Sequence, residues 1–188
     1  MKSAIILHGM PSREEYFGLN GSLQQNKHWL PWIKEELMAE GVKVFSPEFP
    51  EPYLPVYENW KKSFEELEVD KDTILIGHSC GAGFILRWLS ENKIQVGKVA
   101  LVAPWIDPRG QLQNDFFNFK IDKDLLSRAT GVCIFISKDD DKDILDSFEI
   151  IKKELPEVDV RWFENYGHFT FGDMKTIEFP ELKNFVLE

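Results

Sequence analysis

The stretch that decides the fold covers residues 73–83 and reads Thr-Ile-Leu-Ile-Gly-His-Ser-Cys-Gly-Ala-Gly. It begins with an apolar run typical of a buried strand, and an amphipathic helical pattern follows from Ser79 to Glu91. Between the two, Gly77 to Gly81 match the pattern G-x-S-x-G. In this strand–turn–helix context the pattern predicts a sharp turn that presents Ser79 as a nucleophile. The flanking glycines are needed sterically, because side chains there would crowd the turn.

The same turn allows two other interpretations. A glycine-rich connection between a strand and a helix can exist without any chemistry. A dinucleotide-binding loop matches less well, because the glycines do not follow G-x-G-x-x-G, and the sequence contains no Walker A string. The start of a helix favours developing negative charge, since free N–H groups and the positive end of the helix dipole meet there. The nucleophile interpretation therefore accounts for more features of the strand–turn–helix sequence than the other two.

Outward from this stretch, short apolar runs alternate with helical patterns along the whole chain. The expected strands cover residues 4–7, 42–45, 73–76, 99–102, 132–136 and 158–163. The expected helices cover residues 29–40, 56–67, 79–91, 144–155 and 177–187. Strands that alternate with helices predict a doubly wound α/β sheet with helices on both faces. At 188 residues, we expect one domain over residues 1–188.

Composition and charge exclude several classes of protein and partner. The chain has 22 Lys and Arg against 32 Asp and Glu, so its formal net charge is −10. Such a surface disfavours nucleic acid and anionic membranes as partners. Cys80 and Cys133 do not make a disulfide framework, and the apolar run after Lys2 is too short for a signal peptide or a membrane span. We expect a cytoplasmic protein.

A nucleophile on this fold should be followed along the chain by an acid and then a histidine. His168 is the only histidine C-terminal to Ser79, and it lies just past the sixth expected strand. The acid should follow the fifth strand, where residues 139–143 read Asp-Asp-Asp-Lys-Asp. One carboxylate there would orient His168, and this reasoning leaves open which one. The run lacks the Gly and Glu of a calcium loop, so neither a metal nor a cofactor is expected.

Together these motifs resemble the retinoblastoma-binding protein 9 (YdeN-like) family of small serine hydrolases, within the α/β-hydrolase superfamily. The resemblance spans nearly the whole chain and rests on His28-Trp29 with Trp32, Gly77 to Gly81, Ser137-Lys138-Asp139-Asp140, and Gly167-His168-Phe169. It implies a minimal α/β-hydrolase without a large lid, with a mainly parallel six-stranded sheet in the order 2-1-3-4-5-6. It also implies a triad in which Ser79 is the nucleophile, Asp140 the acid and His168 the base.

The resemblance further implies an oxyanion hole made of two backbone N–H groups. One is that of Cys80. The other is that of Met10, because Leu7-His8-Gly9-Met10 resembles the His-Gly turn common in the superfamily. The retinoblastoma-binding member carries the signature L-x-C-x-E, which this sequence lacks. No protein partner is therefore predicted.

Two connections exceed the usual length, at residues 10–27 and 105–127. Both follow the expected carboxyl end of a strand, where open α/β sheets bind ligands. The first mixes apolar and small polar residues, which predicts either one rim of the site or a surface excursion. The second carries four aromatic side chains that either shape an acyl pocket or cover the core, namely Trp105, Phe116, Phe117 and Phe119.

These features predict a hydrolase of small carboxylic esters that acts on small-molecule substrates through an acyl-enzyme on Ser79. Cleavage of amides or thioesters, and acyl transfer to an acceptor other than water, use the same groups. The alternative is a protein-binding module on a hydrolase scaffold with little or no turnover, since a fold does not prove a function. The presence of Ser79, Asp140 and His168 in the expected order favours the enzyme.

Overall fold

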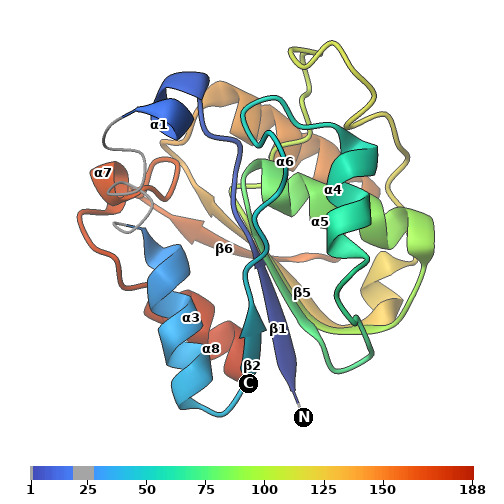
Figure 1. Ribbon diagram of the computed structural model, residues 1–188, viewed down its shortest axis with the longest axis vertical. Coiled ribbons are helices and arrows are strands. Elements are labelled where there is room, and N and C mark those ends of the chain that lie inside the picture. The colour runs from blue at the N-terminus through green and yellow to red at the C-terminus, as the bar shows by residue number, and fades with distance from the viewer. Residues whose placement is uncertain (1, 19–27) are drawn as a thin grey trace.

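A parallel sheet of six strands runs through the middle of the structure (Figure 1). The computed structural model describes residues 2–18 and 28–188. The strand order is β2-β1-β3-β4-β5-β6 and all five pairings are parallel, which confirms the predicted fold. The strands are β1 (Ser3–Leu7), β2 (Lys43–Phe45), β3 (Ile74–His78), β4 (Val96–Val102), β5 (Ala129–Ser137) and β6 (Asp159–Phe163).

Helices cover both faces of this sheet (Figure 1). They are α1 (Arg13–Phe17), α3 (Trp29–Ala39), α4 (Tyr57–Phe64), α5 (Cys80–Asn92), α6 (Lys142–Glu154), α7 (Phe171–Met174) and α8 (Pro180–Leu187), with a short 3-10 helix η1 (Leu125–Arg128). α3 and α8 share one face, and α4, α5 and α6 share the other. Right-handed crossovers produce this division, because the connection from β1 to β2 crosses the sheet in the opposite direction to the others.

The core fills both sides of the sheet with aromatic side chains. On the face of α4 and α5, the ring of Phe84 lies 5.8 Å from that of Trp60 and 5.4 Å from that of Phe64. On the face of α3 and α8, the ring of Phe179 lies 5.7 Å from that of Trp29 and 5.5 Å from that of Phe135. The central strand β3 is buried along its whole length. Burial on both faces explains why its sequence is a continuous apolar run.

Several element boundaries differ from the expected ones for local chemical reasons. The last helix begins at Pro180 instead of residue 177, since proline fits the first turn, where its missing N–H is not needed. The unexpected helix α1 starts at a capping box, in which Ser12 accepts from the N–H of Glu15 and the Glu15 side chain accepts from the N–H of Ser12. Within the described residues, no helix is long and apolar enough to cross a membrane.

Parallel pairing brings the carboxyl ends of all six strands to one edge of the sheet. The turn after β1, the turn after β3 and the loops after β4, β5 and β6 therefore meet there. These five connections contain every residue that the sequence singled out as a candidate site residue. The topology itself thus gathers residues that lie up to 158 positions apart, from Met10 to His168.

Candidate active site

Ser79 occupies a strained turn between β3 and α5. Its φ of 53° and ψ of −119° are unusual for a residue other than glycine. The turn is possible because its neighbours lack side chains. A Cβ on Gly77 would lie 2.6 Å from Cα of Ala82, and a Cβ on Gly81 would lie 2.3 Å from the carbonyl oxygen of His8. The close approach of backbone on both sides explains the two glycines of the motif.

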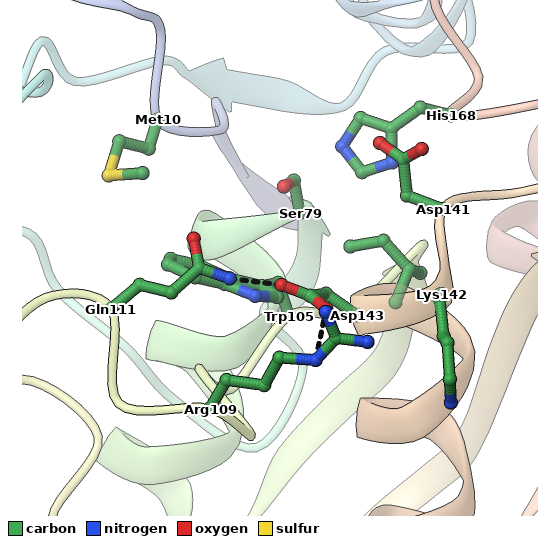
Figure 2. Close-up of a pocket in the computed structure, with 10 residues that line it drawn as sticks. Met10, Ser79, Trp105, Arg109, Gln111, Asp141, Lys142, Asp143 and His168 are labelled. Carbon is green, nitrogen blue, oxygen red and sulfur yellow. Dashed lines mark hydrogen bonds and ion pairs between the residues drawn. The ribbon is translucent and has the colours of Figure 1, made fainter.

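A cavity of about 450 Å³ opens beside Ser79 (Figure 2). His168 lines the same cavity from the loop after β6, and Met10 lines it from the turn after β1. The remaining lining residues come from the loop after β4 and the start of α6, and are Trp105, Arg109, Gln111, Asp141, Lys142, Asp143 and Ile144. The structure thus places the candidate nucleophile and the candidate base around one space.

The carboxylate that reaches His168 belongs to Asp140. The distance from His168 Nδ1 to Asp140 Oδ1 is 3.0 Å, and Nδ1 donates because a carboxylate accepts. The same oxygen accepts from the N–H of Asp141 at 2.7 Å, while Oδ2 is buried without a hydrogen-bond partner among the described residues. Burial raises the pKa of Asp140, and the hydrogen bond from His168 opposes that rise. Because Nδ1 is engaged by Asp140, Nε2 is the ring nitrogen of His168 that this carboxylate leaves free.

The neighbouring carboxylates have other contacts. Asp139 accepts from the hydroxyl of Ser137 at 2.5 Å and from the N–H of Gly167 at 3.2 Å. Ser137 in turn accepts from the N–H of Tyr166 at 3.1 Å, so the pair holds the loop before His168. The hydrogen bond from Ser137 lowers the pKa of Asp139. Asp141 lies at the start of α6 and faces the cavity (Figure 2).

The main chain of His168 is held on both sides by polar side chains. Its N–H donates to Oδ2 of Asp173 at 3.1 Å, and the hydroxyl of Thr170 donates to the same oxygen at 2.7 Å. Its carbonyl oxygen accepts from Nε2 of His78 at 2.8 Å. Since a carbonyl only accepts, Nε2 of His78 must carry the proton. The middle residue of the turn motif therefore supports the loop that carries the candidate base.

Buried histidines surround that support and stay uncharged near neutral pH. Burial lowers the pKa of His78 well below its ordinary value, and the nearby His168 and His28 lower it further. Burial also lowers the pKa of His28 to about 4, with a smaller contribution from His168. The rings of His28 and His78 lie 5.0 Å apart. A charge on either ring would lack solvation, so both act as neutral hydrogen-bonding groups.

The two expected oxyanion donors lie beside Ser79. Cys80 begins α5, where first-turn N–H groups have no intrahelical acceptor, and its thiol is fully buried. Gly9 precedes Met10 and touches the turn, because a Cβ on Gly9 would lie 3.1 Å from Cβ of Ser79. The end of β1 thus lies against the turn that carries Ser79 and Cys80, and Met10 lines the cavity beside it.

A model of the serine hydrolase family matches residues 16–170. The chain belongs to that family. A Bacillus subtilis (strain 168) protein that carries the name hydrolase YdeN is 29% identical over 177 residues, covering 89% of this chain and 86% of that protein. The predicted YdeN-like resemblance is thereby confirmed.

Solved structures agree on the fold of this serine hydrolase. The ydeN gene product of B. subtilis matches with a TM-score of 0.80 at 23% identity, over 98% of this chain and 96% of that chain. Est1E of Butyrivibrio proteoclasticus with bound ferulic acid matches with a TM-score of 0.68 at 12% identity, over 100% of this chain and 88% of that chain. Both likenesses support the α/β-hydrolase architecture.

Of the two roles considered for the four aromatic side chains of this serine hydrolase, the structure favours the core for three and the cavity for one. Trp105 lines the cavity, but Phe116 is fully buried in the core, where its ring lies 5.2 Å from that of Trp60. Phe117 packs edge-on against Trp105 at 5.5 Å, and Phe119 packs against the core, so neither belongs to the lining. The loop folds back over α5, which a main-chain contact confirms: a Cβ on Gly83 would lie 2.0 Å from the Trp105 carbonyl oxygen.

The sequence interpretation missed the polar residues that line the cavity instead. Arg109 and Gln111 come from the loop after β4, and Asp143 comes from the first turn of α6. Charged residues in a loop usually lie in solvent, so their type gave no signal. Their position after the carboxyl end of a strand was the only available indication.

The connection at residues 10–27 is described only in part. Met10 lines the cavity, and the exposed rings of Tyr16 and Phe17 in α1 lie 5.2 Å from that of Tyr53. Residues 19–27 of the expected rim, among them Leu19, Asn20, Gly21 and Ser22, lie outside the described residues. The prediction that this segment helps to select substrate stays a prediction.

Proposed function

We propose that this serine hydrolase cleaves small carboxylic esters through an acyl-enzyme on Ser79. The observation that carries the proposal is the 3.0 Å contact between His168 and Asp140 at a cavity that the strained Ser79 also lines. A nucleophile, a base and a group that orients the base are the parts that acyl transfer requires. The structural neighbour Est1E was solved with a carboxylic acid, ferulic acid, bound to it, which is compatible with this choice.

In the first step Ser79 Oγ attacks the ester carbonyl carbon and its proton moves to Nε2 of His168. The N–H groups of Met10 and Cys80 hold the oxygen that becomes negative. The bond from the carbonyl carbon to the alcohol oxygen then breaks, and His168 gives the proton to that oxygen. Asp140 fixes the tautomer of His168 and stabilises its protonated form.

In the second step a water molecule attacks the acyl carbon, and its proton moves to His168. The bond to Ser79 Oγ breaks, the carboxylic acid leaves, and His168 returns the proton to Ser79. An alcohol in place of water would give acyl transfer with the same groups. Product analysis with added alcohols separates the two outcomes.

A fluorophosphonate probe tests the proposal against an idle scaffold. We expect covalent labelling of the native chain, located to Ser79 by mass spectrometry of its peptides. Ser79→Ala should abolish labelling and lower kcat on an aryl ester by a factor on the order of 10⁶, the loss known for a protease triad. The matched control Ser127→Ala removes a surface hydroxyl and should label normally. Labelling elsewhere, or substantial turnover by Ser79→Ala, would contradict the proposal.

A further inference from the structure

The polar wall of the cavity points to a substrate class. We propose that Arg109, Gln111 and Asp143, which we call the polar bridge, make the enzyme select short acyl groups that carry a hydroxyl or another uncharged hydrogen-bonding group. This inference rests on the proposed ester hydrolysis at Ser79. It replaces the expected aromatic acyl pocket, whose rings the structure places mainly in the core.

The polar bridge joins two elements across the cavity (Figure 2). Arg109 Nε lies 2.8 Å from Oδ1 of Asp143, and the amide nitrogen of Gln111 donates to Oδ2 of the same carboxylate. All three residues line the cavity. The Asp143 side chain is only 19% exposed, so it is substantially removed from water. Both of its oxygens are thus occupied by groups that come from the facing loop.

The loop side of the polar bridge is held in place before any substrate arrives. Asp107 accepts from the N–H of Gln111 at 2.7 Å and from that of Leu112 at 2.9 Å. The N–H of Ile106 donates to the hydroxyl of Ser147 in α6 at 3.2 Å. The contacts to Asp107 order the loop itself, and the contact to Ser147, together with one of 3.4 Å from Arg109 to Oδ2 of Asp146, holds it against α6. The polar bridge is therefore a preformed wall, so binding of a substrate does not include the free-energy cost of ordering it.

The acyl half of the ester is the half that faces this wall. His168 must protonate the departing oxygen, so the alcohol half lies on the His168 side of Ser79. In Figure 2, Met10 and Gln111 lie on the opposite side of Ser79 from His168 and Asp141. The acyl group then points toward Met10, Gln111 and Trp105.

Hydrogen-bonding capacity remains on the polar bridge after its internal contacts are made. The Gln111 amide has a second N–H and a carbonyl oxygen, and the guanidinium of Arg109 has further donors beyond Nε. A hydroxyl on the acyl group finds partners there. A long alkyl chain would displace water from these groups and return no hydrogen bond, which costs free energy. The wall therefore favours short polar acyl groups over long alkyl ones.

Two isosteric aryl esters test the selection directly. The 3-hydroxybutanoyl and 3-methylbutanoyl esters differ only by a hydroxyl in place of a methyl group. We expect the native enzyme to show a kcat/KM for the hydroxy ester about threefold to tenfold higher, as one net hydrogen bond predicts. The octanoyl ester should be the poorest of the three. An equal or reversed ratio of the first two would overturn the proposal.

A double variant removes the wall. Arg109→Met with Asp143→Leu replaces an ion pair by apolar groups, and we expect the ratio to fall below one and octanoyl turnover to rise. The matched control is Lys123→Met with Glu154→Leu, which removes a surface pair of 3.6 Å at the opposite end of α6. The control should keep the native ratio. Gln111→Leu gives the same test with a single substitution. If neither this variant nor the double variant changes the ratio of kcat/KM between the hydroxy and methyl esters, the proposal is overturned.

Failure of the proposed function and failure of this inference give different results. If no ester is hydrolysed and the fluorophosphonate probe does not label Ser79, the proposed function fails and takes this inference with it. If Ser79 is labelled and the 3-methylbutanoyl ester is cleaved as well as the hydroxy ester, only the inference about the polar bridge fails. Both measurements use the full chain.

Discussion

Asp139, Asp140 and Asp141 are chemically identical, and only their surroundings distinguish them. Asp139 faces the loop before His168, Asp140 faces the His168 ring, and Asp141 faces the cavity. The order follows from the sharp turn between β5 and α6, which directs successive side chains differently. The sequence alone left the choice among them open, and the family resemblance selected Asp140. The observed contact agrees with that selection.

Substitution of each aspartate by asparagine should separate these surroundings. We expect Asp140→Asn to lower kcat most, by about 10⁴ if it acts like the orienting acid of a serine protease, because the wrong His168 tautomer becomes favoured. Asp139→Asn keeps an oxygen that accepts from Gly167 and should cost far less. Steady-state kinetics on one aryl ester gives the comparison. A larger loss at residue 139 or 141 would show that another carboxylate orients His168.

At the scale of elements, the short segment from Tyr166 to Lys175 carries the base on a loop and not on a regular element. Its main chain is tied to β3 through His78 and to the start of α7 through Asp173. Gly167 has a φ of 45°, and a Cβ there would lie 2.7 Å from Cγ of Asp173. The loop is thus fitted closely to the carboxylate of Asp173, which holds the main chain at His168.

Removal of that carboxylate should loosen the base. We expect Asp173→Ala to lower kcat roughly tenfold to a hundredfold with little change in KM, since a small displacement of a reacting group has costs of this size. Asp173→Asn keeps an acceptor oxygen and should recover most of the activity. Parallel thermal unfolding shows whether the variants stay folded. Equal kcat for the native chain and folded Asp173→Ala would disprove the positioning role.

His28 at the start of α3 should make the free energy of unfolding depend on pH. His28 caps this helix by accepting from the N–H of Leu30, and its pKa falls from 6.5 to about 4 on folding. Between these values the unfolded chain binds more protons, so the free energy of unfolding falls as pH drops from 6.5 to 4. His28→Asn keeps a good cap and removes the titration, so its unfolding should vary less over this interval. Chemical denaturation at several pH values measures the slope; an identical slope in both proteins would contradict the expectation.

At the scale of the whole molecule, the sheet could be predicted and the cavity wall could not. Continuous apolar runs indicate the strands, and the family resemblance supplies their order, because burial on both faces leaves a strong local signal. Arg109 and Asp143 are 34 positions apart, and each alone is typical of a solvated surface. Their pairing depends on how a long loop folds back over α5, which local pattern does not encode. For the same reason the sequence left open whether Phe116 lines the site or fills the core.

Thiol reactivity should report the integrity of the whole sheet. Cys80 and Cys133 are both buried and free, and burial raises the pKa of the Cys133 thiol to about 11. Burial likewise raises that of Cys80. We expect an aromatic disulfide reagent to modify neither thiol of the native chain at neutral pH and both after unfolding, with the midpoint in denaturant matching that of circular dichroism. Rapid modification without unfolding would show local opening of the site.

The acidic run of residues 139–143 should be more sensitive to insertions and deletions than its repeated aspartates suggest. Deleting or duplicating one aspartate hardly alters the residue count, yet every later carboxylate moves by one position. Because the three aspartates are identical, position 140 keeps an aspartate after either change, but the turn between β5 and α6 becomes one residue shorter or longer. The partner of His168 and the partner of Arg109, Asp140 and Asp143, are then displaced relative to each other in a single genetic event. Point substitutions leave this spacing unchanged. Insertions and deletions in this tract should therefore be far less tolerated than its monotonous spelling suggests.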